Sequence, residues 1–295
     1  MEARASERLA PAKVNLFLHV GPLGPDGYHP ICSLMVFADI GDTLRLAPAA
    51  AMAFEVEGPF AAFSSVGPDN LVRHARDRLF AEFAAPPSPF RLTLDKQLPL
   101  AAGLGGGSAD AAATLELVAW FIGALPPARL EAIARDLGAD VAACLAARAL
   151  VAEGRGERLA AAPRLPPLAA VLVNPGAPSP TAAVYRAFDE SPGETPAPAR
   201  ADRPALPAAF RTPAAVAAFL ATTRNDLEAP AIAGEPRIAQ ALAALREEPE
   251  TLFARMSGSG ASSFALCENR EAARRLAGRL AAAHPAWWVR ACVLR

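Results

Sequence analysis

Alternating hydrophobic and polar residues dominate the first hundred positions and predict a sheet. Successive side chains of a strand point to opposite faces, so this pattern is typical of strands with one buried face. Strands are expected over residues 9–20, 34–37, 43–46, 52–56 and 90–94. Between the last two strands, a Val-Gly-Pro-Asp turn predicts a helix that Asp69 caps and that ends near Phe83, before a cluster of prolines.

Helical periodicity then replaces the alternation. A helix is expected over residues 108–121, with Ser108 as its N-cap, because a serine there can accept a hydrogen bond from the first turn. A second helix is expected over 127–137, where a glycine follows its last turn. A short apolar helix comes next, with Asp140 as its N-cap. This middle region is therefore expected to be a layer of helices.

The last third of the chain contains segments with helical periodicity and segments with the alternation of strands. Helices are expected over 214–220, 226–232, 236–245 and 271–283. Strands are expected over 170–173, 252–256, 262–266 and 287–293. The Pro- and Glu-rich segment 191–207 predicts a surface loop. The order strand, turn, strand, helix, strand at the end predicts an α+β second domain.

Composition narrows the class of protein. The chain has 295 residues, 53% of them hydrophobic, which suffices for one large domain or two. Its formal net charge of −1 lacks the basic excess of nucleic-acid-binding proteins, so no nucleic-acid partner is expected. No apolar run has membrane-spanning length and no signal-peptide core is present, so we expect no membrane partner and a cytoplasmic location. Four widely spaced cysteines predict neither a disulfide framework nor a zinc site.

The most informative segment is the loop 99–113, with the sequence PLAAGLGGGSADAAA. Four glycines fall within five residues, so the backbone N–H groups of this loop can approach an anion closely. The helix that follows directly adds unpaired N–H donors and the positive end of its dipole. Loop and helix together predict a phosphate-binding site, and therefore a nucleotide-using enzyme.

Other types of glycine-rich loop fit this segment less well. No Gly-Lys-Ser/Thr ends it, which excludes a Walker A motif. A dinucleotide-binding fingerprint would need Gly or Ala in place of Ser108, and the acidic residue at a suitable distance, Glu131, lies in a helical pattern. A nicotinamide dehydrogenase is therefore disfavoured. A flexible loop without a ligand is the structural alternative, and it is disfavoured because so many glycines are entropically costly.

Two further segments accompany the loop, in the order typical of the GHMP kinase superfamily. They are PAKVNLFLHV at 11–20 and MSGSGASSFAL at 256–266, so the resemblance spans nearly the whole chain. It implies an α+β, two-domain GHMP kinase fold, with a ribosomal-protein-like N-terminal domain and an α/β-sandwich C-terminal domain. The expected boundaries are 1–165 and 166–295, with the active site in the cleft between the domains.

Four details resemble one branch of the superfamily, whose acceptor is a cytidine diphosphate-linked methylerythritol. They are the pairing of Lys13 with Asn15, the segments DGYHPICSL and DIGDTL, the triple glycine and the LGAD motif. The resemblance implies ATP-dependent phosphorylation of the acceptor's 2-hydroxyl, a step in non-mevalonate isoprenoid precursor biosynthesis. Two alternatives stay open: another GHMP kinase acting on mevalonate, homoserine or a sugar, and a non-catalytic nucleotide- or RNA-binding protein.

Phosphoryl transfer to an alcohol requires a base for the hydroxyl and positive charge near the phosphates. The resemblance assigns these roles to Asp140 and Lys13, and implies that the two side chains pair. Only Lys13 and Lys96 are lysines among 29 basic residues, and a lysine between apolar strand residues is costly to bury unless it is paired. From position alone, a helix-capping Asp140 and a solvent-facing, edge-strand Lys13 are the structural alternatives.

The same resemblance implies the rest of the site. The ATP phosphates are expected on Pro99, Leu100, Ala101, Ala102, Gly103, Leu104, Gly105, Gly106, Gly107, Ser108 and Ala109. The acceptor is expected on Asn15, Tyr28, His29, Thr181, Tyr185, Gly258, Ser259 and Gly260. Tyr28 and Tyr185 are expected to sandwich the cytosine ring, with His29 as a neutral hydrogen-bond partner. Mg²⁺ is expected together with ATP, its ligands unassigned, in a monomer or weak homodimer.

The chain departs from the family pattern near both motifs. Asp110 stands where the family often has Asn, and a carboxylate close to ATP phosphates is unfavourable unless it is compensated. Val141, Ala142, Ala143 and Cys144 follow Asp140, where the family commonly has a Pro and aromatic residues. Neither departure removes a group expected to take part in catalysis, so an active enzyme is expected.

Overall fold

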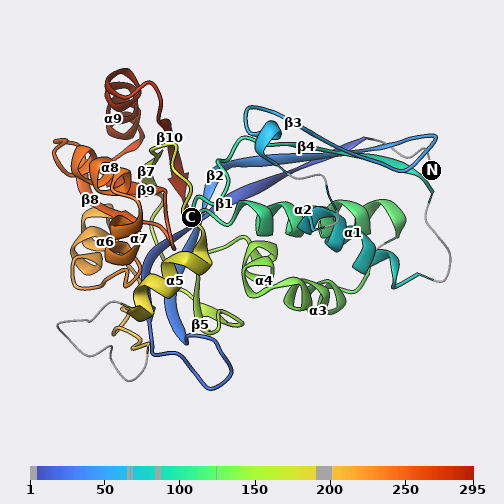
Figure 1. Ribbon diagram of the computed structural model, residues 1–295, viewed down its shortest axis with the longest axis horizontal. Helices are drawn as coiled ribbons and strands as arrows, with labels where there is room; N and C mark the ends of the chain where they lie inside the picture. The colour runs from blue at the N-terminus through green and yellow to red at the C-terminus, as the bar shows by residue number, and fades with distance from the viewer. Residues whose placement is uncertain (1–4, 65–66, 68, 84–87, 124, 191–200) are drawn as a thin grey trace. The chain divides into compact units, whose positions relative to one another are not determined.

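A computed structural model describes residues 5–64, 67, 69–83, 88–123, 125–190 and 201–295 (Figure 1). The chain divides into two compact units, each assembled from separate stretches of sequence. The first unit comprises residues 1–12, 40–100 and 105–147. The second unit comprises residues 13–39, 101–104 and 148–295. No helix within the described ranges is both long and apolar enough to span a membrane.

The strands of the first unit form one layer. Strand β4 (Phe90–Asp95) pairs antiparallel with the second half of β2 (Ile31–Pro48) and parallel with β3 (Ala53–Glu57). The helix α1 (Leu71–Phe80) makes the crossover between the two parallel strands, as parallel pairing requires. Strand β1 (Ser6–Val20), which begins in this unit, also pairs with β2.

The expectation of two strands at 34–37 and 43–46 is wrong, because β2 runs through both without a break. Polar residues around Gly41 interrupt the hydrophobic alternation there, but they do not end the strand. A Cβ on Gly41 would lie 2.0 Å from the carbonyl oxygen of Ala10. Glycine therefore lets the two chains approach closely at the point where the sequence pattern predicts a gap.

Helices of the first unit lie on one side of its strands (Figure 1). Helix α2 (Gly106–Ile122) packs against α1 and against α4 (Ala139–Ala146), while α3 (Pro127–Leu137) packs against α1 and α4. Every residue of α2 from Ala109 to Ala119 is buried except Glu116. Helix α2, which follows the glycine loop, is therefore the central helix of its unit.

All three predicted N-caps are wrong by one to three positions. Helix α1 is capped by Asn70, whose side chain accepts a hydrogen bond from the N–H of Val72, and the helix ends at Phe80. Helix α2 starts two residues before Ser108, with Gly105 at its N-cap. Helix α4 has Gly138 at its N-cap, which places Asp140 in the first turn. Part of the predicted turn before α1, Val66 and Pro68, lies outside the described residues.

The second unit is built on an antiparallel sheet in the order β10, β7, β9, β8. Its strands are β7 (Leu168–Asn174), β8 (Thr251–Met256), β9 (Ser263–Cys267) and β10 (Trp288–Leu294). Its helices are α5 (Thr181–Glu190), α6 (Pro213–Leu220), α7 (Glu228–Gly234), α8 (Arg237–Arg246) and α9 (Arg270–Ala283). The expected strand, turn, strand, helix, strand order is confirmed.

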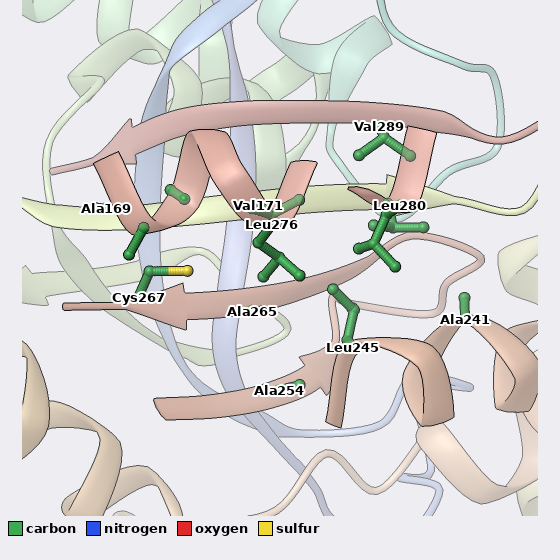
Figure 2. Close-up of a cluster of buried hydrophobic side chains, with 13 residues drawn as sticks. Ala169, Val171, Ala241, Leu245, Ala254, Ala265, Cys267, Leu276, Leu280 and Val289 are labelled. Atoms are coloured by element: carbon green, nitrogen blue, oxygen red, sulfur yellow. The ribbon is translucent and has the colours of Figure 1, made fainter. Parts of the chain in front are cut away.

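One face of this sheet is covered by α8 and α9. Figure 2 shows Leu276 and Leu280 of α9 and Leu245 of α8 directed at Val171 of β7 and at neighbouring strand residues. Full burial of a leucine contributes roughly 1.5–3 kcal/mol relative to exposure. The hydrophobic residues that give the helices and strands their sequence periodicity are therefore the ones buried in this core. This explains why these elements could be predicted from the sequence.

Two strands and one α-helix were not predicted from the sequence, and neither was the short 3-10 helix Ala61–Phe63. Strand β5 (Leu150–Gly154) pairs with the first half of β2, and β6 (Arg158–Ala161) pairs with β5. Both are short and contain charged residues, which weaken the alternation. Helix α5 begins at Thr181, directly after the segment Pro178-Ser179-Pro180, whose composition is typical of a loop. Of the predicted loop 191–207, residues 191–200 lie outside the described residues. Residues 201–207 are described and contain no helix or strand.

A buried histidine of the second unit gives its stability a pH dependence. His19 Nδ1 donates to the carbonyl oxygen of Asp202 at 2.7 Å, and Nε2 accepts from the N–H of Arg224 at 3.3 Å. These two bonds require the neutral ring. Burial lowers the pKa of His19 below 6.5, with the Arg224 charge acting in the same direction and the Asp202 and Asp226 carboxylates opposing it.

We expect the free energy of unfolding to fall as the pH drops below about 6.5, because the unfolded chain then binds a proton that folded His19 does not. In His19→Gln this part of the slope is absent, whereas it persists when the exposed His74 is changed to Gln. Urea unfolding between pH 5 and 7 measures the slopes. Identical slopes in wild type and His19→Gln would contradict the assignment.

Candidate functional site

The glycine loop leads from β4 into the N-terminus of α2. Gly105, the N-cap, has φ +63° and ψ +20°, a left-handed conformation that favours glycine. No side chain caps the helix, and the first intrahelical bond there runs from the N–H of Ala109 to the carbonyl of Gly105 at 2.9 Å. The N–H groups of residues 106–108 therefore precede the helical ladder, and their dipole favours an anion. This local geometry fits a phosphate group.

A second glycine of the loop is held by the turn 257–260. The hydroxyl of Ser257 donates to the carbonyl of Gly103 at 2.9 Å, and the N–H of Ser262 donates to the carbonyl of Ala102 at 3.0 Å. Gly103 has φ +71°, and a Cβ there would lie 2.2 Å from the carbonyl oxygen of Ser257. Two glycine-rich motifs, distant in sequence, are thus packed backbone to backbone within the second unit.

A buried cluster of charges lies beneath the start of α2 in the first unit. Lys96 Nζ lies 2.5 Å from Asp42 Oδ2 and 2.8 Å from Asp110 Oδ2, and all three side chains are buried. Asp42 Oδ1 also accepts from the N–H groups of Gln97 and Leu98 at 2.6 and 2.8 Å. The carboxylate of Asp42 therefore fixes the segment that leads from β4 into the loop.

The cluster holds two carboxyl groups for one ammonium. Burial is the largest effect on Asp110 and raises its pKa to about 8, with Asp42 adding to the rise and Lys96 opposing it. Burial also lowers the pKa of Lys96, but the two carboxyl groups outweigh it and raise that pKa overall. Asp110 is therefore largely protonated at neutral pH, and the cluster is close to neutral. A neutral Asp110 is compatible with the phosphate that the sequence predicts at the N-terminus of α2.

Lys13 and Asn15 occupy the middle of β1, on the same face because they are two residues apart. Both are buried, with exposed fractions of 6% and 2%. The N–H of Lys13 donates to the carbonyl of Leu104 at 2.8 Å, and the N–H of Asn15 donates to Ser257 Oγ at 3.1 Å. Lys13 is therefore not a solvent-facing edge lysine. Through these two backbone bonds, the strand that carries Lys13 and Asn15 contacts both the glycine loop and the 257–260 turn.

The structure also brings together Thr181 and Ser259. Their hydroxyl oxygens are 2.9 Å apart, and the hydroxyl of Ser179 donates to the carbonyl of Ser259 at 2.6 Å. The start of α5 is thereby fixed to the 257–260 turn. Gly258 faces Asn15: a Cβ on this glycine would lie 3.2 Å from Asn15 Oδ1. Four residues expected to bind the acceptor are therefore neighbours in space.

The aromatic residues form a second group. The rings of His29 and Tyr185 have centroids 5.2 Å apart, and Phe188 meets the same histidine edge-on at 5.7 Å. His29 Nδ1 donates to the carbonyl of Gly21 at 2.9 Å, and Nε2 lies 3.2 Å from Asp189 Oδ1. His29 is thus held by a carbonyl and a carboxylate within the second unit.

Tyr28 lies beside this group in sequence but makes a different contact. The residue is 57% exposed, and the guanidinium of Arg155 lies over its ring at 4.5 Å from the centroid. Arg155 also pairs with Asp26 at 2.6 Å. A cation over the ring still leaves an aromatic surface in solvent, so a stack of Tyr28 on a base stays a prediction.

Asp140 belongs to the first unit, in the first turn of α4. It is partly exposed, and α4 packs against α2, the helix that follows the glycine loop. A carboxylate in a first turn is favoured by the helix dipole. The side chain is not the N-cap, so the structural alternative weighed from its position does not hold. Its role as a base stays a prediction.

Sequence reasoning missed several residues that organise these motifs. They include Asp42, Ser33, Ser179, Asp189 and Asn225. Lys96 carried a usable signal, because it is one of two lysines in an arginine-rich chain. Small polar residues such as Ser33 carry no such signal, since serines are common on surfaces and only the fold shows that this one is fully buried.

Comparison with known proteins places these motifs in context. Residues 70–148 match the GHMP kinases N terminal domain, and residues 207–286 match the GHMP kinases C terminal domain. The 4-diphosphocytidyl-2-C-methyl-D-erythritol kinase of Caulobacter vibrioides is 57% identical over 97% of this chain and 98% of its own. The namesake from Xanthobacter autotrophicus is 48% identical over 97% of this chain and 98% of its own.

Solved structures agree with the fold. A crystal structure of 4-(cytidine 5'-diphospho)-2C-methyl-D-erythritol kinase has a TM-score of 0.75 at 35% identity, covering 98% of this chain and 99% of its own. Methanococcus jannaschii mevalonate kinase has a TM-score of 0.73 at 12% identity, covering 100% of this chain and 99% of its own, and shows similarity of fold alone. The two-domain fold of mixed helices and strands that the motifs predict is confirmed.

Proposed function

Because the chain belongs to the GHMP kinases, and among them to the 4-diphosphocytidyl-2-C-methyl-D-erythritol kinase family, we propose that it phosphorylates the 2-hydroxyl of 4-diphosphocytidyl-2-C-methyl-D-erythritol with ATP. The observation that carries this proposal is the neighbourhood of Asn15, Gly258, Ser259 and Thr181. Three polar residues and one glycine from three separate motifs converge there, and residues 102–103 of the glycine loop contact the same turn. The product would be an intermediate of the non-mevalonate route to isoprenoid precursors.

The donor side rests on the glycine loop. Uncapped N–H groups at the start of α2 and the side-chain-free loop before it fit the phosphates of ATP, which residues 99–109 would bind. Mg²⁺ would accompany the nucleotide and neutralise phosphate charge. It is typically held by one or two carboxylates together with phosphate oxygens and water, so a dedicated cage of side chains is not required. Among the described residues no group of three or more His, Cys, Asp or Glu forms one.

The acceptor side requires a proton acceptor and a cation. Asp140 would take the proton of the 2-hydroxyl as that oxygen forms its bond to the γ-phosphorus and the bond to the β-phosphate oxygen breaks, which leaves ADP. Lys13, buried on β1, would stabilise the negative charge that develops on the oxygen and the transferring group. Gly258 and Ser259 would direct backbone N–H groups at the substrate diphosphate or the transferring phosphate. Gly260 would shape this turn, since its N–H donates to the carbonyl of Ser257 at 3.0 Å.

The cytosine ring would lie against Tyr185 and Tyr28, with His29 beside it. We expect Tyr185→Ala to raise the KM for the cytidine substrate by about tenfold, because a lost aromatic contact costs its buried area and roughly 0.5–1.5 kcal/mol more. The KM for ATP should stay within about twofold, and Tyr185→Phe should retain the wild-type KM because the ring remains. Steady-state kinetics with each substrate varied in turn measures both. An equal rise in both KM values would contradict a role at the base.

The proposed specificity is tested by ADP release in a coupled assay. The purified chain is offered the cytidine diphosphate-linked methylerythritol, mevalonate, homoserine and galactose in parallel. We expect turnover with the first acceptor only. Turnover with another acceptor of the panel would replace the proposed substrate, and the absence of ADP release with all four would favour a non-catalytic nucleotide-binding protein.

The remaining expectations follow from this function. The substrates are small and water-soluble, so we propose a cytoplasmic enzyme that needs neither membrane nor nucleic acid, as a monomer or weak homodimer. The two domain-level matches lie on either side of position 165, which supports the proposed boundary between residues 1–165 and 166–295.

A further inference from the structure

The orientation of the Asn15 amide is set by a directional chain of hydrogen bonds within the second unit. Ser33 Oγ lies 2.6 Å from the carbonyl oxygen of Phe17 and 2.7 Å from Asn15 Nδ2. Two oxygens at 2.6 Å must share a proton, and a carbonyl has none to give. The single hydroxyl proton of Ser33 therefore points at Phe17. The lone pairs that remain on Ser33 can only accept, so they select the NH₂ end of the amide.

The other end of the amide is thereby fixed as well. Asn15 Oδ1 is buried and has no hydrogen-bond partner within the described residues. It faces the 257–260 turn, where a Cβ on Gly258 would lie 3.2 Å from it. A buried acceptor without a donor costs about 1–3 kcal/mol. An amide that were free to turn would be expected to relieve this cost, but Ser33 prevents it.

We propose that Ser33 is a positioning residue, which holds Asn15 Oδ1 as a ready hydrogen-bond acceptor for a hydroxyl of the phosphoryl acceptor. The inference rests on the proposed function, in which Asn15 contacts that substrate. Ser33 is fully buried, and among the described residues its hydroxyl bonds only to β1, so it acts through Asn15. Ser257 holds the same strand from the other side, since its hydroxyl accepts from the N–H of Asn15 and donates to Gly103.

The test combines Ser33→Ala, Ser33→Thr, Asn15→Ala and the double variant Ser33→Ala with Asn15→Ala. We expect Ser33→Ala to lower kcat/KM for the acceptor by about tenfold, the effect of roughly one hydrogen bond, with the KM for ATP changed less than about twofold. Ser33→Thr keeps the hydroxyl and should stay within about threefold of wild type. In the Asn15→Ala background, Ser33→Ala should have no further effect, because the group it orients is gone.

A full tenfold loss in the Asn15→Ala background, or no loss in the wild-type background, would overturn the proposal. Should the alanine variant not fold, Ser33→Cys fills the site with a slightly larger side chain whose sulfur is only a weak acceptor. It should give an intermediate loss, and wild-type kinetics in Ser33→Cys would count against the proposal.

A readout that needs no turnover separates this inference from the proposed function. The side-chain NH₂ signals of Asn15 in a ¹⁵N-correlated NMR spectrum are assigned by their loss in Asn15→Ala. They should shift in Ser33→Ala and stay near their wild-type positions in Ser33→Thr. Unshifted signals in Ser33→Ala would overturn the positioning role even in an active enzyme, whereas shifted signals in a protein without kinase activity would count against the proposed function alone.

Discussion

Replacement of Asp140 by alanine is expected to lower kcat by about 10²–10⁴, the usual contribution of a general base. The KM for ATP should change little, because the glycine loop, which we propose to bind the phosphates, is intact. Asp140→Asn should be almost as slow, since the amide keeps the volume and the place in the first turn of α4 but cannot accept a proton. Steady-state ADP release with saturating acceptor measures the effect.

A matched control lies on the preceding helix. Asp136 of α3 is exposed and pairs with Arg78 at 2.7 Å. Asp136→Ala should retain wild-type kcat, since a surface ion pair is worth about 0–1 kcal/mol in stability and does not meet the substrate. A kcat for Asp140→Ala within about threefold of wild type would remove this residue from the mechanism.

The largest expected loss of stability follows from Lys96→Met. Methionine has a similar length but no charge, so it leaves the buried carboxyl groups of Asp42 and Asp110 without their cation. Removal of one partner from a buried ionic group typically costs about 3–5 kcal/mol. The segment that enters the glycine loop is anchored by the same Asp42, so we expect weaker ATP binding as well. Urea unfolding and nucleotide titration measure the two losses.

Asp110→Asn is the matched control. The amide can still accept from Lys96, and it replaces a group that is largely protonated at neutral pH, since its pKa is raised to about 8. Below about pH 4, where Asp110 is protonated in the folded and the unfolded chain alike, the variant should therefore stay within about 1 kcal/mol of wild type, and at neutral pH it should be the more stable of the two. The pKa of Asp110 is raised on folding, so its contribution to stability is complete below about pH 4 and is lost as the pH rises through 8; the variant should lack this decline. A Lys96→Met loss no larger than that of Asp110→Asn would contradict the proposed charge balance.

The sequence was informative wherever a residue type is rare or its pattern is strongly periodic. The glycine loop, the strand that carries Lys13 and Asn15, and the elements of the α8–α9 core all follow from such patterns. The caps failed because several candidates stood within three residues of each other. Asn70 took the place of Asp69, and glycines with positive φ took the places of Ser108 and Asp140.

The candidate site was predictable as a set of residues, and much less so as a set of contacts. Nothing in the sequence indicates that Ser33 directs the amide of Asn15, or that Asp42 accepts from the backbone ahead of the loop. Both depend on tertiary pairing of segments far apart in the chain. Lys96 was singled out by composition alone, and only the fold shows that it balances Asp42 and Asp110.

Transfer of phosphate to the 2-hydroxyl is tested most directly by proton-coupled ³¹P NMR of the reaction product. In a 2-C-methyl erythritol, carbon 2 carries the methyl group and no hydrogen, so a phosphate on its oxygen has no three-bond proton partner. We expect a new phosphomonoester singlet that grows together with ADP. A doublet or triplet would place the phosphate on a secondary or primary hydroxyl, and the absence of a new signal would contradict the kinase activity itself.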